Sequence, residues 1–165
     1  KHKINTSKLK EIFTNYNDSF QITDTEIKFS SDINKQDIEL KGLNTATATA
    51  KIIKKYVAEK NWTYKDFIVS SFQKNELFQM RKLDENAALG ILSKASVTEA
   101  IELGKLLKAS AIHPSLGIIT RDNVKASHKA GFNVNVWTVN EPEDIQRMRE
   151  FGVDGIISDF PDRLF

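Results

Sequence analysis

The side chains that could do chemistry in this sequence are few and widely spaced. There are no cysteines, which excludes disulfides, thiolate catalysis and zinc–sulfur sites. Ser70 and Ser71 have no adjacent base in the sequence, which argues against a nucleophilic serine. His113 stands at the end of a predicted strand, whereas His128 lies within a predicted helix beside lysines and is expected to be solvated.

Glu26 and Lys28 form a second candidate pair. They are two residues apart in a predicted strand, so their side chains share one face of it, together with Asp24. Such residues are most often a solvated or partly buried ion pair. Spacing alone therefore leaves both an ion pair and a functional site open.

These residues need a scaffold, and the chain shows a regular one from about residue 66 onward. The sequence predicts strands at 66–72, 87–92, 110–113, 133–139 and 154–158, and helices at 73–83, 97–107, 120–130 and 140–152. Pro142 in the first turn and Gly152 after the end mark the last helix most clearly. Earlier in the chain, we expect a helix at 8–16, a strand at 20–29, an irregular polar connection at 30–44 and a helix at 45–60.

Strands that alternate with helices predict an α/β fold with a parallel sheet. The six predicted strands fit either an open doubly wound sheet or a (β/α)₈ barrel from which units are missing. A doubly wound nucleotide-binding domain would carry a glycine-rich turn, but none of the seven glycines forms a GxGxxG or GxxxxGK pattern. The pattern therefore favours the barrel only weakly. The length and the absence of a composition break predict a single domain over residues 1–165.

Composition excludes several classes of partner. With 40% apolar and 28% charged residues the chain reads as an ordinary globular domain, and its net charge of +2 predicts no nucleic-acid partner. No apolar run approaches about 18 residues, so no membrane span is expected, and the first residues do not resemble a signal peptide. The compartment, cytoplasmic or cell-envelope and secreted, stays open.

Four segments resemble the glycerophosphodiester phosphodiesterase family. They are Thr25–Lys28 (TEIK), Ile68–Phe72 (IVSSF), Asn133–Asn140 (NVNVWTVN) and Gly152–Asp162 (GVDGIISDFPD). The last two are the most specific, because they follow each other in the family's order with one helix between them. The resemblance implies a TIM-barrel fold and a metal-dependent phosphodiester hydrolase that releases glycerol 3-phosphate and an alcohol. The six strands would then be strands three to eight of an incomplete barrel.

The resemblance also implies roles for four residues, and a fifth, His113, is a candidate from its position at a strand end on the same rim. Glu26 would be a ligand of a divalent cation, Mg²⁺ or Ca²⁺, and Lys28 a catalytic residue that offsets phosphate charge. Trp137, Phe72 and His113 would bind the glycerophosphodiester at the C-terminal rim, where barrel active sites form. The alternative is a core position for the two aromatic residues and a hydrogen-bonded loop position for the histidine.

Part of the family's site has no counterpart in these 165 residues. The missing elements are a His-Arg-Gly first strand, a Glu-x-Asp second strand and a second histidine. We therefore expect this chain alone to be inactive and to bind metal weakly or not at all, since one carboxylate holds a hard cation poorly. A second hypothesis is a degenerate barrel that serves binding or scaffolding. In either case open sheet edges favour pairing with the missing N-terminal segment or with a second copy of the chain.

Overall fold

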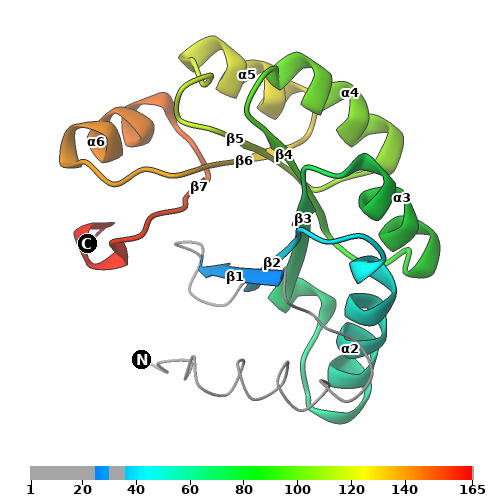
Figure 1. The fold of residues 1–165 in the computed structure, drawn as a ribbon. Helices are drawn as coiled ribbons and strands as arrows, with labels where there is room; N and C mark the ends of the chain where they lie inside the picture. The colour runs from blue at the N-terminus through cyan, green and yellow to red at the C-terminus, as the bar shows by residue number, and fades with distance from the viewer. Residues whose placement is uncertain (1–24, 30–35, 165) are drawn as a thin grey trace.

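The computed structural model describes the backbone of residues 25–29, and both backbone and side chains of residues 36–164. Figure 1 shows a curled sheet with helices along its convex side. The strands are β1 (Thr25–Phe29), β2 (Gln36–Leu40), β3 (Phe67–Ser71), β4 (Leu89–Ser93), β5 (Ala111–Pro114), β6 (Asn133–Val136) and β7 (Gly155–Ile156). The helices are α2 (Thr45–Glu59), α3 (Lys74–Leu83), α4 (Val97–Leu107), α5 (Arg121–Lys129) and α6 (Pro142–Phe151), with 3₁₀ turns at Tyr64–Asp66 and Pro161–Leu164. The helix predicted at 8–16 lies outside the described residues.

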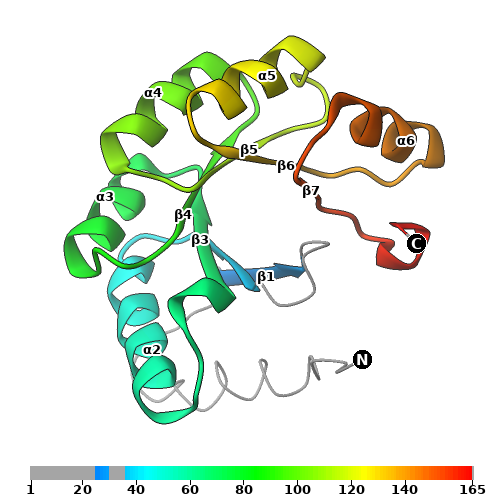
Figure 2. The same ribbon diagram turned by 180° about the vertical axis from the view of Figure 1, so that it is seen from behind.

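The strands lie in the sheet in the order in which they occur in the chain. Each strand from β2 to β7 pairs in parallel with the next, whereas β1 pairs antiparallel with β2. In Figures 1 and 2 the helices α2 to α6 follow one another in an arc around the outside. Six parallel strands with helices on their outer side form a curled, incomplete TIM barrel, as predicted.

One part of the strand prediction was wrong. The stretch 30–44, expected to be an irregular connection, contains the buried strand Gln36–Leu40, which pairs in parallel with β3. The strand expected at 20–29 is described at Thr25–Phe29, and it runs antiparallel to β2. The first strand of the parallel series is therefore β2, not β1.

The reason for this error is the composition of β2. Ile38 and Leu40 belong to the apolar core, whereas Asp37 and Glu39 alternate with them and point to the other face. Buried parallel strands usually read as continuous apolar runs. A strand with two acidic residues on its inner face therefore resembles a polar loop in the sequence.

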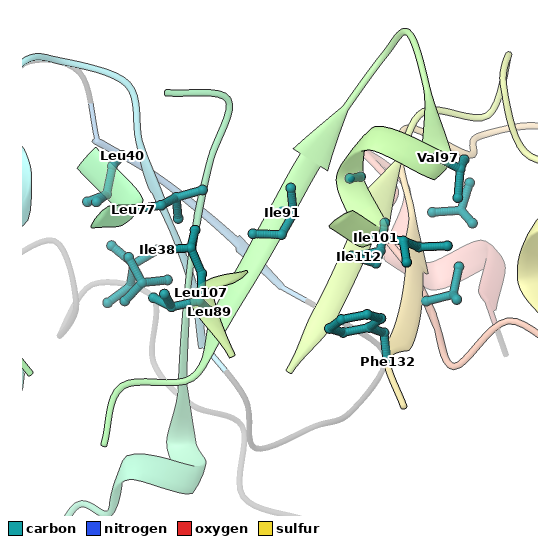
Figure 3. Packing of buried hydrophobic residues seen from close by; sticks show 14 of the residues in the cluster. Ile38, Leu40, Leu77, Leu89, Ile91, Val97, Ile101, Leu107, Ile112 and Phe132 are labelled. Carbon is teal, nitrogen blue, oxygen red and sulfur yellow. The ribbon is translucent and has the colours of Figure 1, made fainter. Parts of the chain in front are cut away.

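The apolar core fills the space between the outer face of the sheet and the helices. Figure 3 shows this layer, in which Ile112 of β5 lies close to Ile101 of α4 and to Phe132, and Ile91 stands on the neighbouring strand β4. The strands contribute Ile38, Leu40, Val69, Leu89, Ile91, Ile112, Val134, Val136 and Ile156, and the helices contribute Leu77, Met80, Val97, Ile101, Leu107 and Met148 among others. Burial of these side chains holds each helix against the strands that flank it.

Candidate functional site

Two aromatic residues meet at the C-terminal ends of the strands. Phe72 directly follows β3 and Trp137 directly follows β6. Their ring centroids are 5.4 Å apart and their planes are inclined by 87°, an edge-to-face contact. Trp137 is half-buried and Phe72 is 44% exposed, so the pair presents an apolar surface to solvent at this rim. The barrel fold thus brings two of the predicted substrate-binding residues together.

His113, the third predicted substrate-binding residue, lies directly behind this pair. Its backbone carbonyl accepts a hydrogen bond of 2.7 Å from the indole Nε1 of Trp137. Its imidazole is only 1% exposed and points into the inner face of the sheet. In this structure His113 therefore supports the rim from beneath rather than forming its surface.

A row of polar side chains, three buried and one partly buried, crosses the inner face. Ser70 of β3 donates a hydrogen bond of 2.7 Å to Oδ1 of Asp37 on β2. Oδ2 of the same carboxylate lies 3.3 Å from Nδ1 of His113, an ion-pair distance without the alignment of a good hydrogen bond. Nε2 of the imidazole lies 3.0 Å from the amide Nδ2 of Asn135 on β6. We call Ser70, Asp37, His113 and Asn135 the inner polar chain.

The predicted metal ligand Glu26 and the predicted catalytic residue Lys28 lie on β1. In the antiparallel register the backbone of Glu26 is opposite Glu39, and that of Lys28 is opposite Asp37. Their side chains lie outside the described part of the structure. Their roles therefore stay predictions, although the backbone places both positions beside the first parallel strand.

Sequence reasoning missed Glu39. Its side chain is 4% exposed and it stands near the C-terminal end of β2, where barrel active sites form. One signal could have found it, because the Asp-x-Glu-x-Lys spacing occurs twice, at 24–28 and again at 37–41. The second copy lies on the parallel series.

A carboxylate such as Glu39 suits a hard divalent cation, which prefers oxygen ligands. Among the described side chains, however, no group of three or more His, Cys, Asp or Glu residues is arranged to hold a metal ion. Glu39 thus fits as one ligand of a cation whose other ligands would come from elsewhere. Within the same residues, no helix is long and apolar enough to cross a membrane.

The geometry first defines the class of protein: an incomplete (β/α)₈ barrel with a buried carboxylate and an aromatic pair at its C-terminal rim. Residues 1–163 match the model of the glycerophosphoryl diester phosphodiesterase family. The chain therefore belongs to this family, and the predicted resemblance is confirmed.

Individual relatives agree with this assignment. The chain is 32% identical over 114 residues to a glycerophosphodiester phosphodiesterase of Caldanaerobacter subterraneus, covering 69% of this chain and 45% of the relative. It is 33% identical over 98 residues to a glycerophosphodiester phosphodiesterase of Bacillus altitudinis, covering 58% of this chain and 40% of the relative. The chain thus spans less than half the length of these two curated relatives.

Solved structures share this incomplete barrel. A putative glycerophosphoryl diester phosphodiesterase from Silicibacter pomeroyi superposes with a TM-score of 0.62 at 28% identity, covering 72% of this chain and 41% of that chain. An Oleispira antarctica phosphodiesterase, solved with the product sn-glycerol-3-phosphate, gives a TM-score of 0.66 at 22% identity, covering 76% of this chain and 51% of that chain. At that identity the second likeness shows the fold alone.

Proposed function

We propose that this protein acts in the hydrolysis of glycerophosphodiesters, with release of glycerol 3-phosphate and an alcohol. The observation that carries the proposal is the family match over residues 1–163, because it includes the rim that holds Glu39, Phe72 and Trp137. In this reaction water adds to phosphorus, the bond from phosphorus to the alcohol oxygen breaks, and the alcohol leaves with a proton.

The cation of the proposed reaction is Mg²⁺ or Ca²⁺. When bound it polarises the phosphodiester and offsets its negative charge. Glu39 and Glu26, which face each other in the backbone register of β1 and β2, are the proposed carboxylate ligands from this chain. Lys28 is proposed to offset phosphate charge in the same place.

The aromatic pair is proposed to bind the organic part of the substrate. The exposed edge of Phe72 and the half-buried indole of Trp137 offer an apolar wall, against which the carbon atoms of a glycerol group can pack. The complex of the Oleispira antarctica phosphodiesterase with sn-glycerol-3-phosphate supports this class of small-molecule ligand.

Hydrolysis of glycerophosphocholine with added Mg²⁺ or Ca²⁺ tests the proposal, with glycerol 3-phosphate as the measured product. We expect no turnover from the 165-residue chain alone. We expect turnover from a polypeptide that also carries the His-Arg-Gly and Glu-x-Asp segments typical of the family. In that polypeptide Glu39→Gln should abolish turnover, whereas Glu85→Gln, which changes an exposed carboxylate, should not.

Two results would contradict the proposal in different ways. Turnover by the 165-residue chain alone would show that its site is complete. Absence of turnover from both polypeptides, with either cation, would reject the enzyme and favour a degenerate barrel that binds without catalysis.

A further inference from the structure

The inner polar chain occupies space that two glycines leave open. A Cβ atom added at Gly90 on β4 would lie 2.7 Å from both Cε1 and Nε2 of the His113 ring. A Cβ atom added at Gly155 on β7 would collide with the Oδ1 atom of Asn135. The imidazole therefore lies across β4 on its way from β5 to Asp37 on β2, and only glycine permits this path.

The neighbours of the two ring nitrogens indicate which of them carries the hydrogen. Nε2 faces the amide N–H of Asn135, so it accepts. Nδ1 faces the carboxylate of Asp37, so it carries the hydrogen. These neighbours suit a His113 ring with its hydrogen on Nδ1 and an accepting Nε2, held in one orientation.

His113 is also bonded to Trp137 at the rim. The carbonyl of His113 accepts from Nε1 of Trp137, and the Trp137 ring meets the edge of Phe72. At the other end, Asp37 shares a strand face with Glu39, two residues further along β2. Through His113, one side of the rim is connected to the other across the inner face.

From these contacts we infer that His113 is a positioning residue, which sets the indole of Trp137 relative to the β2 carboxylate Glu39. The inference rests on the proposed phosphodiesterase function. His113 does not touch substrate in this role, because its imidazole is buried beneath the rim. It transmits the position of β2 to Trp137 at the end of β6.

Nuclear magnetic resonance of the full chain tests the inference without requiring turnover. The ring ¹⁵N signals of His113 should show a protonated Nδ1 and an unprotonated Nε2, while exposed His128 should not share this fixed form. Asp37→Ala removes the carboxylate beside the His113 ring and leaves the sequence of β6 unchanged. It should move or broaden the indole N–H signal of Trp137, and Asp37→Asn, which keeps an accepting oxygen, should restore it.

Trp62 serves as the internal control, because it lies at the opposite end of β3 from Phe72. Its ring stacks on that of Phe67, the first residue of β3, with 5.0 Å between the ring centroids. Its indole signal should not respond to either change at position 37. Gly90→Ala provides a second perturbation, should Asp37→Ala fail to fold, since its added Cβ displaces the His113 ring directly. It too should move the Trp137 signal, whereas Gly117→Ala, with nothing within 4 Å of the new atom, should not.

The positioning role is overturned if His113 carries its proton on Nε2, or if the Trp137 signal ignores both Asp37→Ala and Gly90→Ala. The proposed function fails by a different result, namely no hydrolysis in the assay described above. A fixed imidazole and a coupled Trp137 signal without hydrolysis would reject the phosphodiesterase alone. Hydrolysis without that coupling would reject the positioning role alone.

Discussion

The carboxylate of Glu76, on α3, accepts a hydrogen bond of 2.9 Å from the backbone N–H of Ala46 in the first turn of α2. The same carboxylate accepts a hydrogen bond of 2.7 Å from the backbone N–H of Asn44. Asn44 is in the left-handed conformation (φ 63°) and its side chain makes no capping hydrogen bond. The neighbouring helix therefore supplies the cap that α2 lacks, with a negative charge at the positive end of the helix.

Glu76→Ala should destabilise the fold by about 2 kcal/mol, because it leaves two backbone N–H groups without their acceptor. Urea unfolding followed by circular dichroism measures this loss. Glu99→Ala is the control, since this exposed glutamate lies in the first turn of α4 and its backbone N–H, not its side chain, is bonded to Ser96. Equal stability of Glu76→Ala and the wild type would contradict the capping role.

Gly90→Ala should destabilise the fold by about 1–3 kcal/mol, the usual cost of forcing an extra atom into a packed interior. The added Cβ would lie 2.7 Å from the His113 ring, so either the ring or β4 must shift. Gly117→Ala is the matched control, because its Cβ would meet nothing within 4 Å. Thermal unfolding of the two variants side by side gives the difference, and equal midpoints would reject the tight contact.

Phe72→Ala should weaken substrate binding by about 3- to 10-fold, from loss of the edge-to-face contact with Trp137. Phe78→Ala is an unusually close control, because Phe78 is 43% exposed and Phe72 is 44% exposed. Both variants should keep nearly the wild-type stability. The KM for glycerophosphocholine is measured in the polypeptide that also carries the His-Arg-Gly and Glu-x-Asp segments. A KM that rises only in Phe72→Ala supports a substrate contact of the Phe72–Trp137 pair, and equal KM values in both variants would count against it.

Tyr64 gives a pH-dependent prediction at the opposite end of the strands. Burial raises the pKa of Tyr64 above its ordinary value of 10.0, and its hydrogen bond of 2.8 Å to Asp84 raises it further. A raised pKa in the folded state means that the folded chain holds this proton more tightly than the unfolded chain. The resulting stabilisation is present below pH 10 and declines as the pH rises from there toward the folded pKa.

Tyr64→Phe removes that titration. The difference in unfolding free energy between wild type and Tyr64→Phe should therefore be constant from neutral pH to about pH 9, and should shift against the wild type above pH 10. Urea unfolding at a series of alkaline pH values measures it. A difference that stays constant up to pH 11 would show that the hydroxyl has the same pKa in both states.

Much of the fold could be predicted from the sequence, because its helices carry strong apolar periodicity and clear ends. The helix predicted at 97–107 has those bounds in the structure, with Ser96 accepting from the backbone N–H of Glu99 at its start. The helix predicted at 45–60 is found at Thr45–Glu59, although its cap comes from another helix. Helix starts and ends such as these depend on residues that are close together in the sequence, so they can be predicted from it.

The candidate site was less accessible to prediction. Glu39 lies on β2, a buried strand whose acidic residues make it resemble an exposed loop in the sequence. The Asp-x-Glu-x-Lys pattern around Glu39 also occurs at residues 24–28. The contacts of Asp37 with Ser70 and His113 join residues far apart in the chain, and no local pattern encodes them. The meeting of Phe72 and Trp137 at one rim follows from the barrel, but their edge-to-face geometry does not.

Gly90 and His113 also behave as a single packing unit, because the ring of one fills the space above the other. Natural variation at these two positions should therefore be linked. A relative with a side chain at the position of Gly90 should carry a residue smaller than histidine at the position of His113. A relative that keeps histidine at the position of His113 should keep glycine at the position of Gly90. Gly155 and Asn135 should vary together for the same reason. Among related sequences, a substitution at one position of each pair should therefore be accompanied by a substitution at the other.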